Sequence, residues 1–149
     1  MIRFRDAAEA DLAGVVALLA DDELGGKRED PGPPLPGAYT AGFRKMTAQG
    51  GRILLIVDGD LIVGCLQMHV LYGVSTRSMA RAQIEGVRVA GARRGERLGT
   101  QLMQHAVAEA RAAGCGLVQL TTDLSRIDAQ RFYRGLGFVQ SHAGMKLML

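Results

Sequence analysis

A turn rich in glycine and arginine spans residues 91–100, between an apolar segment and an amphipathic one. It reads Gly-Ala-Arg-Arg-Gly-Glu-Arg-Leu-Gly-Thr and follows the β-branched residues 82–89. A helix that begins in this turn directs its free N–H groups and the positive end of its dipole at an anion, and glycines allow the backbone to approach closely. The turn therefore favours the binding of a phosphate group.

Two common phosphate-binding motifs are excluded because the residues that they require are absent. A P-loop requires Gly-Lys-Ser/Thr after its second glycine, and a dinucleotide-binding turn requires Gly-x-Gly-x-x-Gly with an acid about 20 residues later. Neither pattern is present. Nucleic acid is also disfavoured, because residues 81–97 contain five arginines but no aromatic side chain for base stacking.

Residues 94–99 resemble the Q/R-x-x-G-x-G/A signature that marks acyl-coenzyme A binding in the GNAT superfamily of N-acetyltransferases. The signature is preceded at the expected distance by Val-Arg-Val at 87–89. One position departs from the family pattern, because Arg97 stands where glycine is usual. Backbone amides still supply the cradle there. The arginine has two alternative effects: it adds a positive charge beside the pyrophosphate, or it crowds the site.

A second segment strengthens this resemblance. Residues 129–138 resemble the family's A-x-x-F-Y-x-x-x-G-F signature, with Arg126 at a position where asparagine is frequent. The order of predicted elements resembles the family along the whole chain, while the specific motifs cover residues 82–138.

The resemblance implies an enzyme that moves an acetyl group from acetyl-CoA to an amine by direct attack. We expect the acceptor to be a primary amine of a small molecule, with a protein amine as the less favoured alternative. It implies two neighbouring parallel strands, 82–89 and 117–121, that splay apart around the cofactor, with Gly86 at the bulge that opens them. The strand backbone is expected to pair with the pantetheine arm. The expected cofactor contacts are Val87, Arg88, Val89, Arg94, Gly95, Glu96, Arg97, Leu98, Gly99, Thr100 and Arg126.

Glu85 is the acid that precedes the expected bulge. An attacking amine must lose a proton at neutral pH, so a base near the thioester is useful. We predict that Glu85 takes this proton directly or through a water. The alternative is a half-exposed carboxylate that pairs with Arg81 or Arg88.

Tyr133 lies on the helix that follows the second splayed strand. A phenol has a reference pKa of about 10 and a thiol one of about 8.5, so the hydroxyl can hydrogen-bond to or protonate the departing thiolate. We predict this acid role for Tyr133. The alternative, which we prefer for Phe132, is an aromatic side chain that only fills the core.

The acceptor amine is expected to enter beside the two N-terminal helices and a proline-rich loop at 25–37. Charged and aromatic residues there are candidates for contacting it, although solvated charges at a helix end are the usual explanation. The candidates are Asp22, Glu23 and Tyr39, with Asp123 and His142 in reserve.

The remaining reactive side chains are interpreted as structural. Cys65 and Cys115 lack CxxC spacing, so no disulfide is expected, and Cys65 with His69 lacks the further ligands that a metal site needs. No metal is expected. We predict that His69 is packed in the core and that His105 is solvated.

Hydrophobic periodicity and turn residues predict the elements that position these groups. Helix ends are predicted from Gly114 and from a Ser125–Asp128 capping box. The elements are a strand 2–5, a helix 12–19, a loop 25–37, a helix 35–49, a hairpin 53–57 and 61–71, a strand 82–89, a helix 98–113, a strand 117–121, a helix 125–136, and closing strands 138–139 and 145–149.

This order predicts an α/β (α+β) chain, with one domain over residues 1–149. It resembles the GNAT acyl-CoA N-acyltransferase fold: a mixed, mostly antiparallel sheet of six to seven strands with a splayed parallel pair, and about four helices on both faces.

The composition is that of a globular chain. Its 149 residues are 48% hydrophobic and 22% charged, with a net charge of +3, which excludes a disordered or collagen-like chain. The N-terminus lacks an apolar leader and no run reaches about 18 apolar residues, so a cytoplasmic protein without membrane contact is expected. The resemblance favours a homodimer. The alternative function is a noncatalytic acyl-CoA-binding or regulatory module, against which Glu85 and Tyr133 both argue.

Overall fold

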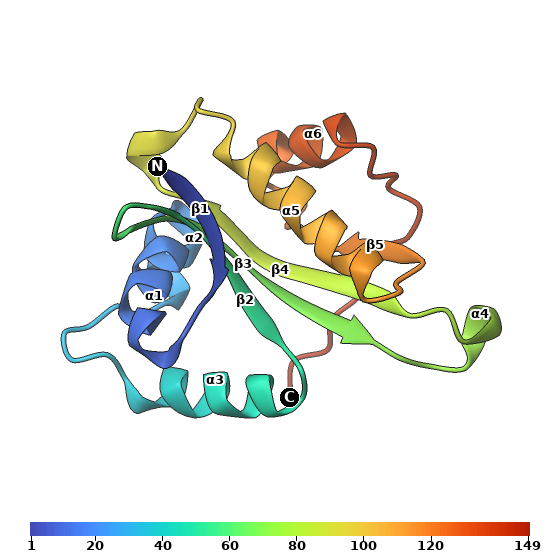
Figure 1. Cartoon of the computed structure of the whole chain (residues 1–149), viewed down its shortest axis with the longest axis horizontal. Helices are drawn as coiled ribbons and strands as arrows, with labels where there is room; N and C mark the ends of the chain where they lie inside the picture. The colour runs from blue at the N-terminus through green and yellow to red at the C-terminus, as the bar shows by residue number, and fades with distance from the viewer. The chain divides into compact units, whose positions relative to one another are not determined.

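A sheet of five strands, in the order β1-β2-β3-β4-β5, forms the centre of the chain (Figure 1). The computed structural model describes residues 1–149, which divide into two units, Met1–Gln119 and Leu120–Leu149. The first four strands pair antiparallel, and β5 runs parallel to β4. The strands are β1 (Ile2–Asp6), β2 (Arg52–Asp58), β3 (Leu61–Leu71), β4 (Arg81–Val89) and β5 (Leu117–Leu120). The predicted α/β class with a parallel strand pair is confirmed, while the single domain stays a prediction.

Helices lie on both faces of this sheet, with α1 on one face and α5 on the other (Figure 1). The short α4 lies in the connection between β3 and β4, residues 72–80, which we call the β3–β4 arm (Figure 1). The helices are α1 (Leu12–Ala20), α2 (Glu23–Arg28), α3 (Gly37–Ala48), α4 (Ser75–Ser78), α5 (Leu98–Ala112) and α6 (Ile127–Gly135), with 3₁₀ turns at Glu9–Asp11 and Gly91–Arg93.

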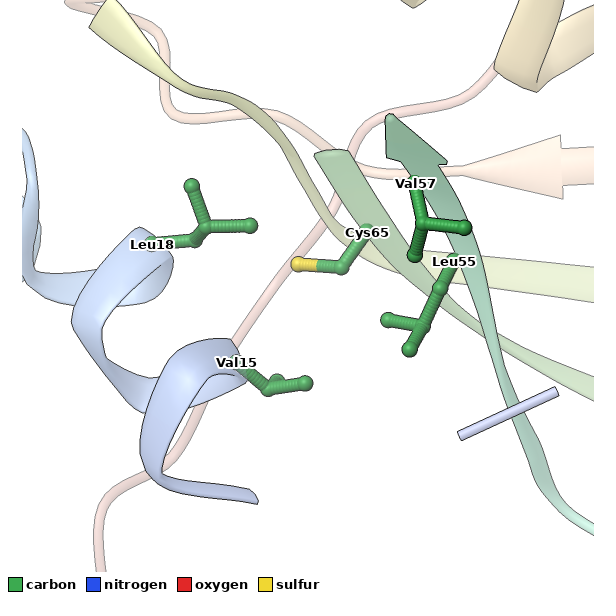
Figure 2. Close-up of a cluster of buried hydrophobic side chains, with 5 residues drawn as sticks. All are labelled: Val15, Leu18, Leu55, Val57 and Cys65. Atoms are coloured by element: carbon green, nitrogen blue, oxygen red, sulfur yellow. The ribbon is translucent and has the colours of Figure 1, made fainter. Parts of the chain in front are cut away.

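The core is built where the apolar stripe of each helix meets the sheet. Val15 and Leu18 of α1 point at Leu55, Val57 and Cys65, all of which are buried (Figure 2). On the opposite face, the buried side chains of α5 are Leu98, Leu102, Met103, Ala106 and Ala110. The spacing of three and four residues in each stripe is the pattern from which these helices were predicted.

The predicted loop 25–37 is wrong at its beginning, because residues 23–28 form α2. The side chain of Asp22 accepts a hydrogen bond from the Gly25 N–H and thereby caps this helix. Such an N-cap satisfies a backbone donor that would otherwise be free, and this offsets the poor helix propensity of Gly25 and Gly26. Only residues 29–36 remain as the proline-containing connection to α3.

The predicted closing strands 138–139 and 145–149 are also wrong, so the sheet has five strands rather than six to seven. The second unit contains α6 and an irregular C-terminal segment, residues 138–149. An alternation of apolar residues is not sufficient for a strand, because the backbone groups of a strand must also hydrogen-bond to a partner strand. Apolar side chains in this segment are exposed: Val139, Met145, Leu147, Met148 and Leu149.

The capping box predicted at Ser125–Asp128 does not form. The Ser125 hydroxyl instead donates to Asp123 Oδ1 at 2.6 Å, and Arg126 is the N-cap of α6 without a side-chain cap hydrogen bond. Serine readily hydrogen-bonds to near neighbours in the chain, and here that local contact takes the place of the helix cap.

Candidate functional site

A bulge in β4 decides which way its polar side chains point. Arg88 lies opposite Cys65 and Glu85 lies opposite Gln67, so β4 places one residue more than β3 between these two pairs. Gly86 occupies this position with φ +61°, a left-handed backbone that glycine adopts at low cost. Glu85 and Arg88 therefore share one face of the sheet, and it is the α1 face, because Cys65 packs against α1. The bulge predicted at Gly86 is confirmed.

Glu85 is exposed on this face. Gln67 Nε2 donates to Glu85 Oε2 at 3.5 Å, which helps to orient the carboxylate from the neighbouring strand. An exposed carboxylate on a rigid strand can take a proton from a bound amine directly or through a water. Its role as a base is not tested by the geometry and stays a prediction.

Beyond the bulge, β4 continues past the end of its neighbour β5. Gln119 Nε2 donates to Gln83 Oε1 at 2.7 Å and joins the two strands there. β5 then ends at Leu120, whereas β4 continues to Val89. β3 pairs with one edge of β4 at Arg88 and Val89, and β5 does not extend along the other edge. Such an edge offers backbone donors and acceptors to an extended ligand.

The loop before α5 has the geometry of an anion cradle. Gly95 and Arg97 have φ values of +88° and +60°, and α5 begins at Leu98 without a side-chain cap hydrogen bond from Arg97. Arg94 and Arg97 are exposed, and a Cβ atom on Gly95 would meet nothing within 4 Å. The amides of the first helical turn, the positive end of the helix dipole and the two arginines together suit a pyrophosphate.

Glu96 belongs to the structure of this loop. Arg93 Nε donates to Glu96 Oε1 at 2.8 Å, and Arg93 Nη1 lies 3.1 Å from Asp58 Oδ2. Hydrogen bonds to Glu96 first and then to Asp58 raise the pKa of the Arg93 guanidinium. Arg93 thus neutralises the charge of the one carboxylate in the loop, and its ion pair with Asp58 joins the loop to the end of β2.

Arg88 is held on the α1 side of the sheet. Its Nε lies 2.9 Å from Asp22 Oδ2, and its Nη1 donates to the Val87 carbonyl at 2.9 Å. The side chains of Arg88 and Asp22 are only 10% and 18% exposed. The ion pair that the structure shows for Arg88 is therefore the one with Asp22. Local sequence patterns do not indicate the Asp22–Arg88 pair, because its members belong to segments far apart in the chain.

The other acceptor candidates of the first unit lie near α2. Glu23 is exposed and lies 3.8 Å from Lys27 Nζ. The Tyr39 hydroxyl accepts from the Asp30 N–H at 2.9 Å and donates to Glu29 Oε1 at 3.2 Å. Neither arrangement tests a contact with the acceptor.

The second unit holds Tyr133 on α6. This side chain is half-buried, and its ring centroid lies 5.2 Å from that of Phe132 and 5.9 Å from that of Phe138. Asp123 accepts from the backbone and hydroxyl of Ser125. His142 lies in the C-terminal segment, with Nδ1 2.6 Å from Ser141 Oγ. These contacts place the candidates without testing their roles.

Cys65, His69 and His105 each pack against neighbouring residues. Cys65 is buried beneath the bulge, where its thiol contacts the Gly86 carbonyl at 3.8 Å, and burial raises its pKa to about 12. His69 packs over Gly51. The prediction that His105 is solvated is wrong, because its ring stacks on Phe4 at 4.5 Å, where α5 crosses β1.

The surface also has a groove outside the region of Glu85 and the loop before α5. This groove of about 660 Å³ lies between α1 and the β2–β3 turn and contains neither Glu85 nor the 94–97 loop. The structure contains no group of three or more His, Cys, Asp or Glu side chains placed to hold a metal ion. None of the helices combines the length and apolar character needed to cross a membrane.

The chain is similar in sequence to known acetyltransferases. The Acetyltransferase (GNAT) family profile matches residues 9–138. The chain is 36% identical over 89 residues to the aminoalkylphosphonate N-acetyltransferase of Salmonella typhimurium, a match that covers 60% of this chain and 56% of that protein. The chain thus spans about half the length of this curated relative.

Solved structures resemble the whole chain. A transcriptional regulator from Bacillus halodurans is 41% identical with a TM-score of 0.95, and a Trypanosoma brucei acetyltransferase is 26% identical with a TM-score of 0.81; both matches cover 100% of each chain. The glucosamine-6-phosphate N-acetyltransferase of Arabidopsis thaliana, at 18% identity and a TM-score of 0.80, shares the fold over 99% of this chain and 98% of its own.

The left-handed backbone of Arg97 predicts an unusual gain in stability. For an L-residue this conformation costs about 1 kcal/mol more than for glycine. We expect Arg97→Gly to raise the free energy of unfolding by about 1 kcal/mol in urea denaturation. Arg94, with φ −64°, supplies the matched control, and Arg94→Gly should not raise it. Equal changes in the two variants would contradict this account of the loop.

Proposed function

The chain belongs to the Acetyltransferase (GNAT) family, and from this membership we propose that it transfers an acetyl group from acetyl-CoA to a primary amine of a small molecule by direct attack. The observation that carries the proposal is the bulged end of β4. This strand presents Glu85 on the α1 face just before an edge that β5 leaves uncovered, and it leads into the cradle before α5.

The cofactor contacts follow from the backbone of this region. Acetyl-CoA supplies the acetyl group as a thioester when it is bound. The edge at Val87–Val89 receives the pantetheine arm, and one of its amides polarises the thioester carbonyl. The N–H groups of Leu98, Gly99 and Thr100 bind the pyrophosphate, and Arg94 and Arg97 add charge. The positive φ values at Gly95 and Arg97 support this assignment.

Two side chains move protons in the proposed reaction. Glu85 takes a proton from the acceptor ammonium, which frees the nitrogen lone pair for attack on the thioester carbon. As the carbon–sulfur bond breaks, Tyr133 donates its phenolic proton to the departing thiolate. The attacking nitrogen loses its second proton as the amide forms, and a proton from water restores the Tyr133 phenol. The proposal for Glu85 is supported by its exposure and its hydrogen bond from Gln67. Tyr133 is supported by its place in the second family signature.

The proposed acceptor class is a small primary amine, and aminoalkylphosphonates are the first acceptors to test. The support is the name of the Salmonella typhimurium relative, which is an aminoalkylphosphonate N-acetyltransferase. Glu23 and Tyr39 are the proposed acceptor contacts. Glu23 is the first residue of α2, and the Tyr39 hydroxyl is hydrogen-bonded to the residues that follow α2.

A second candidate function is a noncatalytic acyl-CoA-binding or regulatory module. The observation in its favour is the name of the Bacillus halodurans protein, a transcriptional regulator that is 41% identical over the whole chain. Such a module would keep the cofactor cradle without turnover.

Turnover separates the two candidates. Free thiol released from acetyl-CoA is measured with aminoalkylphosphonates, polyamines, amino acids, amino sugars and peptides. We expect release with at least one small amine and an acetylated product of matching mass. Binding of acetyl-CoA without turnover on any amine would favour the module, activity on peptides alone would overturn the small-molecule acceptor, and failure to bind acetyl-CoA would exclude both candidates.

Removal of the proposed base should slow the reaction most at neutral pH. We expect Glu85→Gln to lower kcat about 100-fold at pH 7, the lower range for loss of a general base. The difference should shrink as the pH rises, because the acceptor amine then loses its proton to water. The control is Glu109→Gln, which removes a carboxylate of α5 that pairs with Arg52 of β2, and it should leave kcat unchanged. An unchanged rate in Glu85→Gln would remove this residue from the mechanism.

Loss of the Tyr133 hydroxyl should affect turnover more than binding. We expect Tyr133→Phe to lower kcat at least tenfold, while the KM for acetyl-CoA changes less than twofold, because the proton is needed only as the thiolate departs. Tyr72→Phe removes a hydroxyl from an exposed tyrosine of the β3–β4 arm and is the matched control. Full turnover in Tyr133→Phe would overturn the acid role.

A further inference from the structure

Two consecutive aspartates at the end of α1 contact the second half of β4 and the turn after it. Asp22 Oδ2 lies 2.9 Å from Arg88 Nε, and Asp21 Oδ2 accepts from the Gly91 N–H at 3.2 Å. Earlier in β4, Gly86 lies so close to Leu19 that an added Cβ atom would be 3.3 Å from Leu19 Cδ2. The end of α1 thus touches β4 at the bulge and on the side that leads to the cradle.

Asp22 and Arg88 each make a second contact that extends this connection. Asp22 Oδ1 accepts from the Gly25 N–H and caps α2. Arg88 Nη1 donates to the Val87 carbonyl at 2.9 Å. The pair therefore joins the start of α2, near the proposed acceptor contacts, to the strand backbone proposed to bind the cofactor. Both side chains are largely withdrawn from water, so neither charge is well solvated without the other.

The Arg88 side chain is on the wrong face of the sheet for a phosphate contact. Arg88 lies opposite Cys65, which packs against α1, whereas the adjacent pair of Val89 and Gly64 faces α5. The helix that would bind the pyrophosphate is α5, and it covers the other face of the sheet. Strand geometry sends alternate side chains to opposite faces, so Arg88 faces away from α5.

We propose that Asp22 and Arg88 are positioning residues that form a clamp: their ion pair holds the Val87–Val89 backbone against α1 in the arrangement that receives the cofactor. Arg88 serves the cofactor through its backbone and this pairing, and its guanidinium is not a phosphate ligand. The clamp rests on the proposed function, because it assigns a role within the same site.

The two possible roles of Arg88 predict opposite effects of Asp22→Asn. The amide oxygen of asparagine still caps α2, but the charge that holds Arg88 is gone. If Arg88 positions the strand, Asp22→Asn and Arg88→Gln each weaken CoA binding about tenfold in calorimetry. The double variant is no weaker than either single variant, since the pair acts as a unit. If Arg88 binds phosphate, Asp22→Asn frees the guanidinium and CoA affinity is unchanged or rises.

Hydrogen exchange of the free protein gives a readout that needs neither cofactor nor turnover. We expect the backbone amides of residues 87–90 to exchange at least tenfold faster in Asp22→Asn than in the unmodified protein. Asp60→Asn, in the exposed β2–β3 turn, is the control and should leave both CoA affinity and exchange unchanged. If Asp22→Asn does not fold, the Asp22→Asn/Arg88→Gln double variant, which leaves no buried charge unpaired, carries the same comparison.

The outcomes separate the clamp from the proposed function. Unchanged exchange at 87–90 together with unchanged or tighter CoA binding in Asp22→Asn overturns the clamp while the function stands. Absence of CoA binding by the unmodified protein overturns the proposed function, and with it the cofactor role of the clamp, even where exchange is faster. Faster exchange together with weaker CoA binding in both single variants supports the clamp.

Discussion

The single additional residue in β4 is the constraint on which the arrangement of the site depends. In a regular strand, residues 85 and 88 would face opposite sides of the sheet, because side chains alternate. The bulge at Gly86 changes this alternation and turns both side chains to the α1 face. Glu85 is then exposed on the same face on which Arg88 meets Asp22. Glycine makes the bulge inexpensive, because its φ of +61° lies where a side chain is disfavoured.

The same strand carries two different kinds of polar group, a side-chain carboxylate and the backbone groups of one edge. Before the bulge, β4 carries a carboxylate suited to proton transfer, and after it the strand offers backbone groups along an edge that β5 does not follow. The turn at 94–97 then uses left-handed backbone to begin α5 with its amides available to an anion. Arg97 adopts at a cost the conformation that glycine adopts readily, which gives a physical reason for a glycine at this position of the family signature.

Elements with a strong local pattern were predicted well from the sequence. The Asp58-Gly59 turn predicted the β2–β3 hairpin because a tight turn requires positive φ, and Gly59 indeed has φ +60°. The apolar stripes predicted α1 and α5 because each helix buries one face. Short elements were predicted wrongly where a single long-range or capping contact decides the structure. α2 depends on the Asp22 cap, and the C-terminal segment lacks the strand partner that its alternation requires.

The sequence by itself determined the class of fold, because local patterns of apolar and turn residues along the chain indicate the order of its elements. It also predicted a cofactor signature at 94–99 and candidate residues for proton transfer, because these depend on residue types and spacing within short stretches of chain. Only the tertiary structure decided that Asp22 pairs with Arg88, that His105 stacks on Phe4 and that Glu85 and Arg88 share a face. These outcomes depend on strand register and on contacts between segments far apart in the chain. Local periodicity carries no information about either, since many pairings satisfy the same pattern of apolar and polar residues.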